Sequence, residues 1–140
     1  MGILEFVHAQ DPAENRELFG LLGEYATSPL VREKLGGVIN SEPGRLWFIL
    51  TTDDATRVMA FGSLRFGRTA VHLLHLHALE EEADIPVLER CIEFVRKAGA
   101  TRLVTTDYWT RRDLYLRYGF CSIRKIGRFM RFEREFKYEY

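Results

Sequence analysis

The chain has 140 residues, 46% of them hydrophobic, and a formal net charge of zero. This composition is typical of one folded domain and excludes a disordered tail or a miniprotein. No apolar run approaches the ~20 residues of a membrane helix, and the N-terminus lacks a secretory-signal pattern, so we expect a cytoplasmic protein that uses no membrane. The charges are unevenly spread, because residues 1–99 carry 10 basic and 15 acidic side chains whereas residues 100–140 carry 10 and 5.

The first part of the chain alternates strand and helix patterns. A short mixed run at 3–8 predicts a strand. Asp11 followed by Pro12, and Ser28 followed by Pro29, are typical helix starts, because the polar side chain caps the helix and proline suits its first turn. Three apolar runs then follow, with only turns between them, so we expect three antiparallel neighbours. These runs lie at 46–50, 57–66 and 71–78.

The stretch 69–99 combines a strand, an acidic turn and an amphipathic helix. Four apolar residues from Leu88 onward follow the spacing i, i+3, i+4, i+7, which predicts one buried stripe, and Gly99 ends the helix. Since another apolar run follows directly, this stretch forms a βαβ unit with a parallel strand pair. The chain then continues with a strand at 102–106, a short helix from about 110 to 118, and strands at 120–126 and 129–136.

The resulting order is β-α-α-β-β-β-α-β-α-β-β, and two segments add detail to it. Residues 58–64, VMAFGSL, form a strand with a central glycine, and residues 114–120, LYLRYGF, form a helix-to-strand corner. In this order the two segments resemble the third strand and the LYxxxGF motif of the GNAT superfamily, the Gcn5-related N-acetyltransferases. The resemblance predicts an α/β (α+β) fold over residues 1–140, with a mixed, mostly antiparallel sheet flanked by helices.

The resemblance also implies an activity and a site. In the family, acetyl-CoA lies in the cleft between the fourth and fifth strands and gives its acetyl group to an amine acceptor. Tyr115 matches the tyrosine that protonates the leaving thiolate, and Asp107 and Glu80 stand at the ends of the two strands. The cofactor would lie along the residues at the end of the fourth strand, with its pyrophosphate on the N–H groups of the following turn. These cofactor-binding residues are Leu76, His77, Ala78 and Leu79.

The strand-to-helix turn departs from the family pattern. Residues 79–87, LEEEADIPV, contain no glycine, arginine or glutamine and carry four acidic side chains. A close pair of like charges costs on the order of 1 kcal/mol even in partly aqueous surroundings, so the turn is poorly suited to a pyrophosphate. A structural interpretation is that Asp84 caps the helix and the glutamates interact favourably with its dipole. The sequence therefore predicts an atypical GNAT-fold protein with a degenerate acetyl-CoA site.

Three histidines in the run 71–78 raise the alternative of a metal site. On a regular strand His75 and His77 point to one face and His72 to the other. Glu80 or Asp107 could add a carboxylate to His75 and His77 and complete a triad of ligands. Hydrogen-bonded histidines in a core or cleft are the more common outcome, so we expect no metal.

A cluster of aromatic and basic residues follows the fifth strand and forms a candidate substrate-binding platform. It consists of Tyr108, Trp109, Arg111 and Arg112. Aromatic rings stack on bases and arginines pair with phosphates, so this cluster and the basic C-terminal part could bind nucleic acid. The alternative is a helix start in which Thr110 is the N-cap and Trp109 packs on Leu114.

Three functions follow from these patterns and stay open. The first is acetyltransferase-like transfer to a small-molecule or macromolecular amine. The second is modification of a nucleobase with another donor, as in GNAT-fold DNA-modifying proteins of phages. The third is a non-catalytic binding or assembly module, with a homodimer through the aromatic tail at 136–140 as one form of it.

Overall fold

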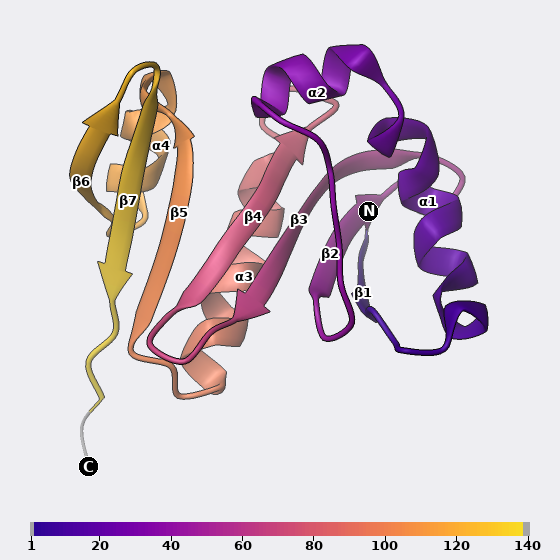
Figure 1. The fold of residues 1–140 in the computed structure, drawn as a ribbon, viewed down its shortest axis with the longest axis horizontal. Coiled ribbons are helices and arrows are strands. Elements are labelled where there is room, and N and C mark those ends of the chain that lie inside the picture. The colour runs from indigo at the N-terminus through magenta and orange to yellow at the C-terminus, as the bar shows by residue number, and fades with distance from the viewer. Residues whose placement is uncertain (1, 139–140) are drawn as a thin grey trace.

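The computed structural model describes residues 2–138 and contains one seven-stranded sheet, which Figure 1 shows as a ribbon. The strand order is β1-β2-β3-β4-β5-β7-β6, and every neighbouring pair is antiparallel except β4–β5. This confirms the predicted GNAT-like sheet. The strands are β1 (Gly2–Val7), β2 (Leu46–Thr51), β3 (Val58–Phe66), β4 (Val71–Ala78), β5 (Arg102–Tyr108), β6 (Cys121–Ile126) and β7 (Phe129–Glu135).

Helices cover both faces of the sheet, because successive side chains of a strand point to opposite faces. In β2, Trp47 packs into one hydrophobic cluster with α1 and α2, whereas Phe48 packs into the other with α3 and α4. Figure 1 shows α3 running behind the middle of the sheet. The helices are η1 (Pro12–Asn15), α1 (Arg16–Ala26), α2 (Pro29–Leu35), α3 (Asp84–Lys97), η2 (Trp109–Arg111) and α4 (Arg112–Arg117), of which η1 and η2 are 3-10 helices.

Local signals explain where most helices begin and end. The side chains of Asp11 and Ser28 accept backbone N–H groups at the starts of η1 and α2, as predicted. Two other predicted caps are wrong. Asp84 is the first residue of α3 and makes no capping hydrogen bond, because Ala83 occupies the cap position. Thr110 lies inside η2, which begins one residue earlier at Trp109.

β4 and β5 pair over only three residues and then diverge. The pairs run from Val71–Leu103 to Leu73–Thr105, at the end of the sheet away from α2. Just beyond them β4 carries a bulge, where the register with β3 shifts and His75 has a φ of 58°. A bulge bends its strand and re-aims the residues that follow. The bulge therefore turns the second half of β4 away from β5.

The end of α2 reaches across to the tip of β5. The Tyr108 hydroxyl donates a hydrogen bond to the carbonyl of Glu33, at 2.7 Å, and the Tyr108 ring stacks on Phe129 of β7 at 4.8 Å. Gly36 ends α2 with a φ of 76°, and a Cβ there would lie 2.5 Å from the Phe129 ring. Glycine is therefore required at this position both by backbone conformation and by space.

We expect Gly36→Ala to lower the free energy of unfolding by about 2 kcal/mol or more, because alanine adds strain at a positive φ and a clash with Phe129. Chemical denaturation of the two proteins measures this difference. Gly37→Ala is the matched control, since a Cβ at Gly37 has no atom within 4 Å. Equal stability of the two variants would contradict the contact between α2 and the β5–β7 tip.

The last described residues fold back onto the same core. Phe136 is buried, its backbone N–H donates to the carbonyl of Thr101, and the Tyr138 hydroxyl donates to the carbonyl of Ala100. Residues 139 and 140 of the predicted tail lie outside the described residues. Within the described chain, no helix is both long and apolar enough to cross a membrane.

Candidate active site

Arg111 lies across the divergence of β4 and β5. Its Nη1 atom donates to the carbonyl of Leu76 on β4, at 3.2 Å, and lies 3.1 Å from the Asp107 carboxylate on β5. Its Nη2 atom pairs with the carboxylate of Asp84 at the start of α3. One side chain thus joins β4, β5 and α3 at the point where the two strands diverge.

Tyr115 and Asp107 form the buried centre of this network. The Tyr115 hydroxyl donates to Asp107 Oδ2 at 2.6 Å, and its ring is fully buried between Phe132 and Phe120. Burial raises the pKa of Tyr115 well above its usual value, and the Asp107 charge raises it further. The hydroxyl therefore stays protonated at neutral pH, with its proton directed at Asp107. The structure places Tyr115 and Asp107, both predicted as site residues, in direct contact.

Burial also raises the pKa of Asp107, although Arg111 and the hydrogen bond from Tyr115 act in the opposite direction. The other carboxylate oxygen accepts the backbone N–H of Tyr108 at 2.7 Å. Asp107 is thus a fixed carboxylate whose proton affinity is higher than that of an exposed aspartate. Such perturbed groups inside clefts are typical of functional sites.

The acidic turn before α3 offers little to a pyrophosphate. The N–H groups of Leu79 and Glu80 donate to the carbonyl of Met59, and those of Ala83 and Ile85 donate within the turn. The Glu80 carboxylate pairs with Arg57 at 2.6 Å, while Glu81 and Glu82 are exposed. The side chains of this turn are therefore acidic, and four of its N–H groups already donate to carbonyl groups of the protein.

A small cavity of about 170 Å³ lies beside Asp107 in the diverging strands. Its walls come from β4, β5 and the end of α2, and they are Leu35, Leu74, His75, Leu76, Thr105, Thr106 and Asp107. The contribution of α2 was not visible in the sequence, because Leu35 is far from the other residues along the chain. The cavity has room for a small group such as an amine, with the Asp107 carboxylate in its wall.

The histidines of β4 pack as ordinary side chains. The ring of His75 stacks on that of Trp47, with the ring centroids 5.9 Å apart, and its Nε2 lies 3.2 Å from Asn40 Oδ1. The ring of His77 lies against that of Phe61, with the centroids 5.6 Å apart. Burial lowers the pKa of His75 to about 4, so it is neutral at neutral pH. Among residues 2–138, no group of three or more His, Cys, Asp or Glu side chains is placed to hold a metal ion.

The prediction that His72 lies opposite His75 and His77 is wrong. His72 pairs with Arg65 and His77 pairs with Phe61, and these two β3 residues are four apart on one strand. Cross-strand partners share a face, so His72 and His77 lie on the same face of the sheet. The bulge at His75 adds one residue to β4 and so shifts by one residue the alternation of its side chains between the two faces of the sheet.

The structure places the four residues of the predicted aromatic and basic platform in different surroundings. Arg111 faces the cleft and Tyr108 packs under the end of α2, so neither is available for a base. Trp109 is 46% exposed, with the ammonium group of Lys125 above its ring at 4.7 Å, and Arg112 is exposed. Sequence reasoning missed Asp84 as the partner of Arg111, because it was interpreted as a helix cap.

No protein-family model matches this sequence, and no curated protein matches it. Solved structures match over most of the chain. An acyl-CoA N-acyltransferase from Pseudomonas aeruginosa is 14% identical, with a TM-score of 0.71, over 96% of this chain and 99% of that chain. Escherichia coli ElaA is 10% identical, with a TM-score of 0.72, over 96% and 100%.

The PaiA N-acetyltransferase from Thermoplasma acidophilum, solved in complex with coenzyme A, is also similar. It is 14% identical, with a TM-score of 0.68, over 97% of this chain and 100% of that chain. At these identities the likeness concerns the fold. The chain therefore has the fold of the GNAT acetyltransferases, as its sequence predicted.

Proposed function

We propose that this protein is a GNAT-fold enzyme that transfers an acyl group to an amine in the cleft between β4 and β5. The observation that carries the proposal is the buried Asp107–Tyr115 pair beside the small cavity. Asp107 acts as the general base: the amine nitrogen attacks the acyl carbon, the bond to the leaving group breaks, and the proton of the amine passes to the carboxylate. The raised pKa of Asp107 favours this step.

Tyr115 acts as a positioning residue in this proposal. Its hydroxyl is buried and donates to Asp107 Oδ2, so it fixes the direction of the carboxylate. Arg111 lies across the path between the strands, so the acyl donor has to bind beside it or displace it. The acidic turn provides no contact for a pyrophosphate, so the donor is an acyl thioester bound through its acyl and thiol ends.

The proposal predicts that acetyl-CoA is no better a donor than a truncated thioester, the acetyl thioester of N-acetylcysteamine, which carries no phosphate. An enzyme that uses the phosphates of acetyl-CoA would lose about 100-fold or more in kcat/KM with the truncated donor, because remote binding energy accelerates the reaction. Thiol release with a panel of amines measures kcat/KM for both donors.

We expect the two values of kcat/KM to agree within about threefold, since no pyrophosphate contact is lost. Asp107→Asn should abolish the activity, and Arg112→Gln, which changes an exposed residue outside the cleft, is the control. A strong preference for acetyl-CoA would contradict the role of the acidic turn. Absence of transfer from either donor would reject the enzyme and favour a binding module.

A second function, nucleic-acid binding, is supported by the basic surface around β6. All six residues of β6 are exposed, and no ion pair joins the neighbouring cations to a carboxylate within the described chain. Trp109 adds an exposed ring on which a base could stack. The cations are Arg112, Arg117, Arg124, Lys125 and Arg128.

If this surface binds nucleic acid, the affinity for a short labelled DNA falls steeply as salt rises, because each phosphate contact releases a counterion. Fluorescence anisotropy over a series of salt concentrations measures the slope. Arg124→Gln combined with Lys125→Gln should lower the slope by about 2, and Arg16→Gln with Arg32→Gln is a control of equal charge. No binding at low salt would eliminate this function.

A further inference from the structure

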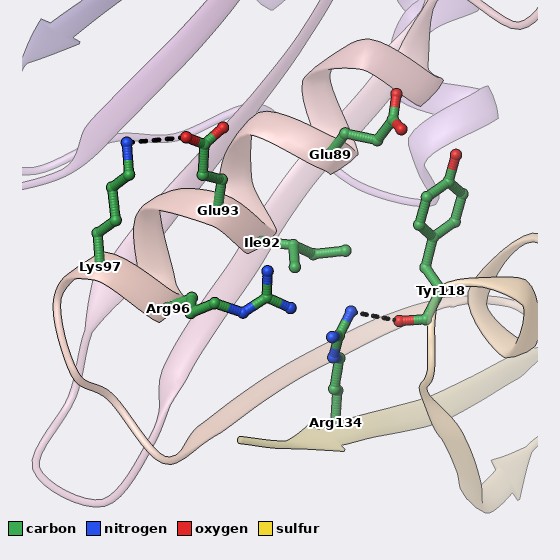
Figure 2. A pocket seen from close by; sticks show the side chains of 7 residues that line it. All are labelled: Glu89, Ile92, Glu93, Arg96, Lys97, Tyr118 and Arg134. Carbon is green, nitrogen blue, oxygen red and sulfur yellow. Dashed lines mark hydrogen bonds and ion pairs between the residues drawn. The ribbon is translucent and has the colours of Figure 1, made fainter. Parts of the chain in front are cut away.

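A second groove lies between α3 on one side and the end of α4 and β7 on the other. Its volume is about 530 Å³, and Figure 2 shows its lining. None of its residues lines the cavity beside Asp107. They are Glu89, Ile92, Glu93, Arg96 and Lys97 of α3, Tyr118 after α4, and Arg134 of β7.

Two arginines face each other at one end of this groove. The guanidinium groups of Arg96 and Arg134 point toward the same space in Figure 2, and both lie over the buried ring of Phe136, at 5.9 and 4.8 Å from its centre. Arg134 is also fixed by donating to the carbonyl of Tyr118 at 2.6 Å. The two cations are thus held close together by contacts that do not neutralise them.

Glu93 also lines the groove, and the hydrogen bond and charge of Lys97 and, more weakly, the charge of Arg96 lower the pKa of its carboxyl group. Within residues 2–138 no ion pair reaches either guanidinium group, because Glu93 pairs with Lys97 at 2.8 Å and Glu133 pairs with Arg102 and Arg131. Burial lowers the pKa of Arg134, and the charge of Arg96 lowers it further. Arg134, which its hydrogen bond fixes, and the neighbouring exposed Arg96 together form a receptor for an oxyanion, since each guanidinium group can donate two parallel hydrogen bonds.

The rest of the groove is lined by an apolar and an aromatic side chain. Ile92 forms its floor, and the ring of Tyr118 stands at the other end with Glu89 facing its hydroxyl in Figure 2. A phosphate group takes up about as much space as a few water molecules of about 30 Å³ each. The volume of the groove is several times larger. An apolar or aromatic body therefore fits between the arginine pair and Tyr118.

We propose that this groove binds a small organic anion, with its phosphate or carboxylate group between Arg96 and Arg134 and its aromatic or apolar body over Ile92 against Tyr118. The proposal does not depend on activity in the β4–β5 cleft. It predicts a site for an effector or for a charged portion of a substrate.

The test is a titration with phenyl phosphate, benzoate and inorganic phosphate at constant ionic strength, followed by NMR shifts of Ile92 and Tyr118. We expect saturable binding, with phenyl phosphate or benzoate binding tighter than inorganic phosphate, and the better of the two identifies the anionic group. Arg96→Gln should weaken binding about tenfold, as expected for loss of one charge-assisted contact. Arg134→Gln should have the same effect.

Arg32→Gln is the control, because Arg32 is an exposed arginine outside the groove. If Arg134→Gln unfolds through loss of its bond to Tyr118, Arg96→Gln decides, since the Arg96 side chain is exposed and donates no hydrogen bond within the described chain. Unchanged affinity in Arg96→Gln, or non-saturable shifts that are equal in the control, would overturn the proposal.

Discussion

Replacing Arg111 by alanine is expected to lower the free energy of unfolding by about 3–5 kcal/mol at neutral pH, the usual cost of removing one partner from a buried ion pair. The variant leaves two carboxylates, Asp84 and Asp107, close together without their shared cation. It also removes the hydrogen bond to the carbonyl of Leu76, which joins β4 to the end of β5. Urea unfolding of the two proteins measures the difference.

The deficit of Arg111→Ala should shrink as the pH falls below neutrality, because Asp107, whose pKa burial already raises, then takes up a proton and no longer repels Asp84. The folded protein already holds a proton on Asp107 more readily than the unfolded chain does, so the contribution of Asp107 to stability falls as the pH rises through that window. Without Arg111 the pKa of Asp107 rises further. Arg112→Ala is the control and should change stability by less than about 0.5 kcal/mol. A deficit that does not vary with pH would contradict the ion-pair network.

Neutralising the acidic turn is expected to increase the affinity for acetyl-CoA by about 10- to 100-fold, since each like charge removed is worth about 1 kcal/mol near a phosphate. The variant combines Glu80→Gln, Glu81→Gln and Glu82→Gly. Glycine suits position 82, where φ is 61°. Isothermal titration calorimetry on the variant and the parent protein measures the change.

The matched control removes three glutamates of α1 and η1 instead, through Glu14→Gln, Glu17→Gln and Glu24→Gln. It changes net charge by the same amount, so it separates a local effect at the turn from a general one. We expect the control to change the affinity for acetyl-CoA by less than about twofold, because screened charges far from a ligand contribute little. Equal gains in both variants would show that the turn does not exclude the phosphates.

The strand and helix order was predictable because its signals are local. The apolar run at 71–78, the stripe that begins at Leu88 and the stop at Gly99 each act within a few residues, and together with the LYLRYGF corner they predicted the GNAT-like fold correctly. The predicted site residues Asp107 and Tyr115 also came together. They are eight residues apart, across a strand end and a short helix.

The remaining features of the site depend on contacts that are distant in sequence or unusual in residue type. Asp84 and Arg111 are 27 residues apart, so the acidic side chain was interpreted by its nearest helix alone. The bulge of β4 is formed by His75 at a positive φ, where glycine is the usual signal. Without glycine the run looked like a regular strand, and the faces of its histidines were assigned with the wrong alternation.

The short pairing of β4 with β5 has a consequence for association between copies. Only three residue pairs join the β5–β7–β6 unit to the rest of the sheet, and the covalent link to it passes through the exposed turn at Gly99. The two parts also differ in net charge, since residues 1–99 carry 15 acidic and 10 basic side chains and residues 100–140 carry 5 acidic and 10 basic ones. If this seam opened, it would leave strand edges that a second copy could pair with, as in three-dimensional domain swapping.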